Sequence, residues 1–65
     1  MEILNRLPGM VSNQLKNFKS TCKQTRSAAY KDEINCKFVG YIAALEDTHT
    51  ITSAEFLKLM QWFTK

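Results

Sequence analysis

Four basic side chains in the first half of the chain are the strongest candidates for binding chemistry. They are Lys16, Lys19, Lys23 and Arg26. Their spacings of three and four place them on one face of a helix. Residues 3–31 contain six basic residues and no acid, in a chain of formal net charge +3. Such a face predicts an acidic partner, whether nucleic acid, anionic lipid or a protein patch, although an ordinary solvated helix has the same pattern.

The single tryptophan is a second candidate for partner binding. Trp62 falls outside the apolar stripe of the last predicted helix, and Trp is enriched at the energetic centres of protein interfaces. The alternative is that its ring folds back over the first helix or the N-terminal residues and completes the core. Leu57 and the apolar residues near the N-terminus are further groups that a small bundle is expected to leave uncovered.

Residues that commonly catalyse reactions or bind metals are few. His49 is the only histidine, and Cys22 and Cys36 fall on apolar helix faces, where a thiol is expected to be buried and inert. A zinc site needs about four Cys or His ligands, more than the chain contains. A calcium loop ending at Glu55 needs an acid and a glycine where Ala44 and His49 stand. The sequence predicts no cofactor, no metal site and no enzymatic activity.

The elements that must position these groups are helices. Apolar periodicity predicts an all-α protein with helices at about residues 10–24, 27–46 and 52–63. Residues 1–9 form a lead-in, either a short turn of helix ended by its proline or a loose apolar arm. Apolar residues on two sides of the second helix predict a neighbour on each side. Because the last link is short, we predict a compact three-helix bundle with an antiparallel C-terminal helical hairpin.

The start of the last helix has the most specific local pattern in the chain. Thr52 and Glu55 have the spacing of a capping box, in which each side chain bonds the backbone amide of the other residue. Ile51 and Phe56 flank the box as a hydrophobic staple. The pattern predicts a helix start and is fully explained by capping.

Size and composition limit the class of protein. A single domain of residues 1–65 buries only about 60% of its unfolded surface, so a partner or a second copy would stabilise it. Two cysteines are too few for a disulfide scaffold, and the N-terminus lacks the apolar core of a signal peptide. No stretch approaches the ~20 apolar residues of a membrane span. We expect a cytoplasmic protein with reduced thiols.

Residues 40–47, GYIAALED, followed by the Ile-Thr-x-x-Glu start of the last helix, resemble a recurrent type. The pattern is similar to that of small, mostly uncharacterised helical proteins of phages and other mobile elements of Gram-positive bacteria. The resemblance covers about half of the chain. The usual glycine of the link is absent, and His49 is the residue expected to adopt the left-handed conformation instead. The resemblance implies a protein that binds and inhibits or redirects a host factor, including defence nucleases.

These observations predict a small binding protein, a regulator or inhibitor that docks on a host protein. The predicted partner-binding residues are Lys16, Lys19, Lys23, Arg26 and Trp62. The first alternative is a small nucleic-acid-binding protein that uses the same basic stripe. The second is a structural protein that assembles as a homodimer or larger homo-oligomer through leftover apolar surface.

Overall fold

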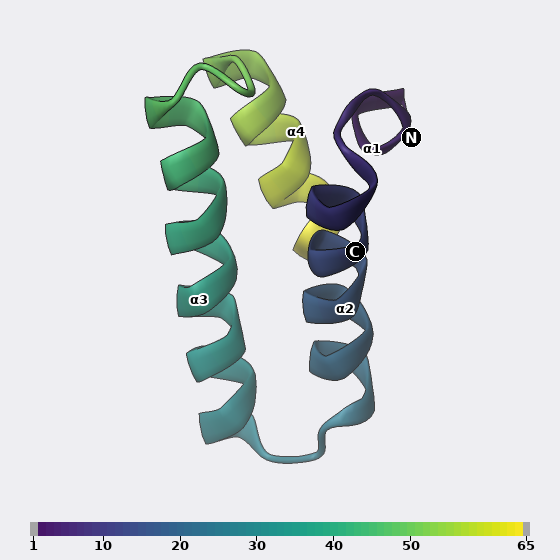
Figure 1. Ribbon diagram of the computed structural model, residues 1–65. Coiled ribbons are helices and arrows are strands. Elements are labelled where there is room, and N and C mark those ends of the chain that lie inside the picture. The colour runs from purple at the N-terminus through teal and green to yellow at the C-terminus, as the bar shows by residue number, and fades with distance from the viewer. Residues whose placement is uncertain (1, 65) are drawn as a thin grey trace.

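Four helices account for most of the structure, a computed structural model that describes residues 2–64 (Figure 1). In chain order they are α1 (Glu2–Arg6), α2 (Gly9–Gln24), α3 (Ala28–Asp47) and α4 (Ser53–Thr64). The described residues contain no strand, so the prediction of an all-α protein is confirmed. The three longer helices begin and end within one residue of the expected ranges, and α1 is an additional helix.

The helices pack through α3, which contacts both α2 and α4. Figure 1 shows α2 and α3 side by side, joined at one end by residues 25–27, while the loop at residues 48–52 turns the chain at the other end. From that loop α4 runs back along α3, and α1 lies near the same loop and packs against α2. The Cα radius of gyration of 11.5 Å is close to the ~11 Å of a folded domain of this length.

The lead-in takes the helical one of its two expected conformations. Ile3, Leu4 and Leu7 are buried in the common core, so these apolar groups are not the uncovered arm that was also considered. Pro8 follows directly and precedes α2, where its missing amide N–H leaves no unsatisfied donor. Burial of three large aliphatic side chains explains why a five-residue helix, too short to be stable alone, is held in place.

Each of the three long helices contributes at least one side chain to the centre of the core. Leu15 of α2, Phe38 and Ile42 of α3 and Leu59 of α4 are completely buried. The Phe38 ring stacks on Phe63 with centroids 4.0 Å apart. All of these residues lie on the apolar faces that the spacing predicts.

The prediction that both thiols are buried is wrong for one of them. Cys36 is exposed and Cys22 is half-buried. The reason is that α2 and α4 pack on the face of α3 that carries Ile34 and Phe38. The opposite side of α3, with Cys36 and Gly40, therefore faces solvent. No helix of residues 2–64 packs there, so the prediction of a neighbour on each side of this helix is wrong.

None of the described helices has an apolar stretch long enough to cross a membrane.

Candidate functional site

The predicted basic stripe is divided between exposed and packed side chains. Lys16 and Lys23 are exposed on α2, two turns apart. Arg26 is also exposed, but α2 ends at Gln24, so it lies in the link before α3 and does not continue the helical face. Lys19 differs from the other three because it is half-buried.

Lys19 and Trp62, both predicted to bind a partner, contact each other. The Lys19 ammonium donates a hydrogen bond to the backbone carbonyl of Trp62, in the last turn of α4. The same Nζ lies 4.5 Å from the centroid of the Trp62 ring, a cation–π geometry. A cation at this end of a helix also compensates the partial negative charge of its terminal carbonyls. Lys19 thus attaches the end of α4 to α2.

The Trp62 ring is part of the packing of the domain. Its centroid lies 6.3 Å from that of Phe38, and the side chain is half-buried against the core. This corresponds to the alternative in which the ring folds back over the first long helix. Among the exposed apolar side chains are Met10, Tyr30 and Leu57, and Leu57 is one that the sequence analysis expected to be uncovered.

An open groove lies where α2 ends, α3 begins and α4 ends. It has a volume of about 330 Å³, and three lysines, Lys19, Lys23 and Lys31, line it. Cys22 and Phe63 contribute apolar surface, and among the lining residues within 2–64 Asp32 is the one acid. We call these residues, together with Asn35 and Thr64, the basic groove.

The basic groove contains a lysine that was not predicted as a site residue. Lys31 belongs to the acid-free segment noted in the sequence, but it lies on α3, and only the packing of α3 on α2 brings it beside Lys23. No carboxylate of residues 2–64 forms an ion pair with Lys23 or Lys31. Lys23 and Lys31 therefore place two exposed ammonium groups at this groove, where Asp32 is the one acid among the described lining residues.

A smaller groove of about 170 Å³ is also lined by residues of α2 and α3. Neutral polar groups such as Gln14, Asn17 and Thr21 line it beside Tyr30, and Lys37 is the one charged residue among the described lining residues. The Lys37 Nζ lies 3.6 Å from Oε1 of Glu33, which is one helical turn earlier in α3. The smaller groove therefore lacks the concentrated charge of the basic groove.

The loop between α3 and α4 is closed by backbone hydrogen bonds to the last turn of α3. The amide of Thr50 donates to the Leu45 carbonyl at 2.8 Å, and the amide of His49 donates to the Glu46 carbonyl at 2.9 Å. This is a Schellman arrangement, which requires a left-handed residue. His49 has φ of 61°, so the prediction that it takes the place of glycine is confirmed.

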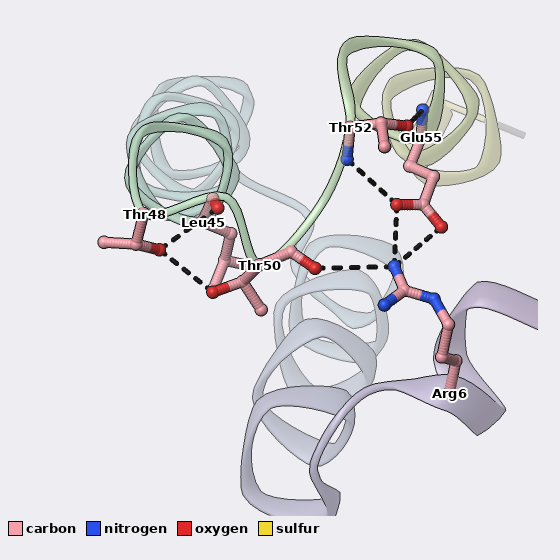
Figure 2. A network of polar contacts seen from close by, with 6 residues as sticks. All are labelled: Arg6, Leu45, Thr48, Thr50, Thr52 and Glu55. Atoms are coloured by element: carbon pink, nitrogen blue, oxygen red, sulfur yellow. Dashed lines mark hydrogen bonds and ion pairs between the residues drawn. The ribbon is translucent and has the colours of Figure 1, made fainter.

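The capping box follows at once and is confirmed by its hydrogen bonds. The Glu55 amide donates to Thr52 Oγ1 at 3.1 Å, and the Thr52 amide donates to Glu55 Oε1 at 2.9 Å. Arg6 Nη2 lies 2.6 and 2.7 Å from the two Glu55 carboxylate oxygens and also donates to the Thr50 carbonyl at 3.4 Å (Figure 2). The Thr52 amide and then Arg6 hold the pKa of Glu55 below its usual value. Both carboxylate oxygens therefore have partners within the protein.

The other groups that metal binding or catalysis would use are dispersed. Within residues 2–64, no three His, Cys, Asp or Glu side chains lie together in a metal-binding arrangement. His49 follows the C-terminal end of α3, whereas Cys22 lines the basic groove beside Asn35 near the other end. The helix rise of 1.5 Å per residue separates these positions by about 20 Å, so Cys22 and His49 cannot act as a pair.

No protein-family model matches this chain, and no curated protein or solved structure matches it at a significant level.

Proposed function

We propose that this chain is a small, non-enzymatic binding protein that regulates or inhibits another protein by docking on an acidic surface of it. The observation that carries the proposal is that Lys23 and Lys31, which form no ion pair with a carboxylate of residues 2–64, line one open groove. Exposed cations on one side of a small domain steer an acidic partner and select against a basic one.

The rest of the fold supports this role by holding the groove rigid. In the proposal, α2, α3 and α4 act as a three-helix bundle, with α3 and α4 as an antiparallel hairpin. Lys16 and Arg26 extend the basic surface beyond the groove, since both are exposed. Lys19 and Trp62 serve mainly to fasten α4 beneath that surface, because each already contacts the other. The cytoplasmic location and the host-directed role suggested by the resemblance belong to the same proposal.

Affinity capture from the source cell tests the proposal. Immobilised protein should retain an acidic protein, and the double variant Lys16→Glu/Lys23→Glu should lose it, because exposed attractive charges become repulsive. Lys58→Glu is the matched control, since Lys58 is exposed on α4 and lies outside the basic groove.

Nuclease treatment of the lysate distinguishes a protein partner from a nucleic-acid partner. Retention that survives nuclease and depends on Lys16 and Lys23 supports protein docking. Capture of nucleic acid alone, or capture that the double variant and the Lys58→Glu control retain equally, contradicts the proposal.

A further inference from the structure

The basic groove is shaped for a segment of chain and not for a broad flat surface. Its volume of about 330 Å³ is at the lower end of the range for small-molecule pockets, so it accommodates one or two side chains. The groove is open to solvent and is lined by residues of three different helices, so a segment bound there would contact all three. These dimensions fit a short linear segment of a partner.

The chemistry of the groove is divided between an apolar floor and a cationic rim. Cys22 is half-buried and Phe63 is only 8% exposed, so both present apolar atoms at the bottom. Lys23 and Lys31 are exposed at the rim, one from α2 and one from α3. A lysine stem lies along apolar surface while its ammonium remains in water, and the compact ammonium pairs with a carboxylate as a point charge.

We propose, on the basis of the function proposed above, that this groove binds a short acidic-apolar segment of the partner protein. A Glu or Asp carboxylate lies between Lys23 and Lys31, and a neighbouring aliphatic side chain covers Cys22 and Phe63.

A protein segment fits these residues better than a nucleic acid does. Asp32 lines the groove next to Lys31 and limits how many negative charges can bind there, whereas a phosphodiester backbone carries a charge on every nucleotide. Binding of single strands relies on exposed aromatic faces for base stacking, but the Phe63 ring is buried and stacks on Phe38. In a protein segment, Asp32 can instead accept a backbone N–H beside the bound carboxylate.

The test is an NMR titration of the whole chain with a defined probe. The probe is a short soluble peptide carrying Glu-Glu-Leu between Gly-Ser ends, and the control peptide carries Gln-Gln-Leu. We expect amide shift changes centred on Lys23, Lys31 and Phe63, with much weaker binding of the Gln peptide. Lys31→Glu should weaken binding about fivefold or more, because it replaces one of the two rim attractions with a repulsion, and a fivefold loss corresponds to ~1 kcal/mol. Lys58→Glu should leave it within about twofold, because that lysine is remote from the groove.

Several outcomes would overturn the inference. They are no shifts at millimolar peptide, equal binding of the Gln peptide, or an unchanged affinity in Lys31→Glu when circular dichroism shows that the variant is folded. Preferential binding of oligothymidylate over the peptide also overturns it. If Lys16→Glu/Lys23→Glu abolishes capture of a protein while Lys31→Glu has no effect on the peptide, the groove inference fails and the proposed function stands. If the peptide binds as expected but capture depends on nucleic acid, the proposed function fails.

Discussion

The two ends of the α3 helix differ in what their charged groups do. At the loop end, Glu55 is occupied by Arg6 and by the Thr52 amide, and the left-handed residue of the loop completes its Schellman motif. At the groove end, Lys23 and Lys31 converge without an ion pair to any described carboxylate. At the loop end, the polar groups bond one another and stabilise the fold. The groove end keeps charge available for a partner, which is why we place the function there.

The groove itself contains two kinds of lysine, one that packs within the fold and two that are exposed. Lys19 contacts both the carbonyl and the ring of Trp62. Like Glu55 at the loop end, it therefore has its partners within the protein. Lys23 and Lys31 are exposed at the rim. Substitution of Lys19 should change the stability of the fold, and substitution of Lys23 or Lys31 should change the binding of a partner.

The largest effect is expected from removing the Lys19 charge. Lys19→Met keeps the aliphatic stem but loses the hydrogen bond, the cation–π contact and the helix-end charge, which together should lower the free energy of unfolding by about 1.5 kcal/mol. Urea unfolding followed by Trp62 fluorescence measures this change. Lys16→Met is the matched control on the same helix, since Lys16 is exposed. A loss of the same size in both variants would show that Lys19 has no special structural role.

A smaller effect is expected at the loop end from loss of the cap. Thr52→Ala removes the oxygen that accepts the Glu55 amide, so the free energy of unfolding should fall by about 1 kcal/mol. Ser53→Ala, at the next residue and exposed, should change it by less than about 0.5 kcal/mol. Chemical denaturation of both variants gives the comparison. An unchanged Thr52→Ala variant would show that the Thr52 hydroxyl does not stabilise the start of α4.

The smallest effect is the pH dependence of the same corner. Because the pKa of Glu55 is lower in the folded chain, its contribution is fully present above the usual carboxyl value of 4.5 and is lost as the pH falls through the lowered value. The free energy of unfolding should therefore decline in acid, and Glu55→Gln should make that decline shallower. Glu46→Gln is the control, since Glu46 forms no ion pair with a described residue. Identical acid profiles for Glu55→Gln and the unmodified chain would rule out this linkage.

Features that involve neighbouring residues were predictable from the sequence. The capping box joins residues three apart, and the helix faces repeat every three or four residues, so their geometry follows from helical periodicity alone. The left-handed His49 was predictable for a similar reason. Many helices end in a left-handed residue, usually glycine, and in this glycine-free link His49 is the residue expected to tolerate that conformation.

The candidate site was predictable only in part. The sequence indicated the basic character of the first half of the chain and named Lys19 and Lys23, which both line the groove. It did not indicate Lys31, whose role depends on the packing of another helix. It also grouped Lys19 with its exposed neighbours, because periodicity assigns a side chain to a face without saying what lies opposite.

The sequence by itself determined the helices, their apolar faces, the cap and the sign of the charge, because each depends on contacts within one or two helical turns. Only the tertiary structure decided which distant residues meet. Arg6 reaches Glu55 across 49 positions, and Lys19 reaches Trp62 across 43. The same packing exposes Cys36 and assembles the groove from three helices. Such contacts depend on how the core side chains interlock, and that arrangement is a property of the whole fold and not of any local pattern.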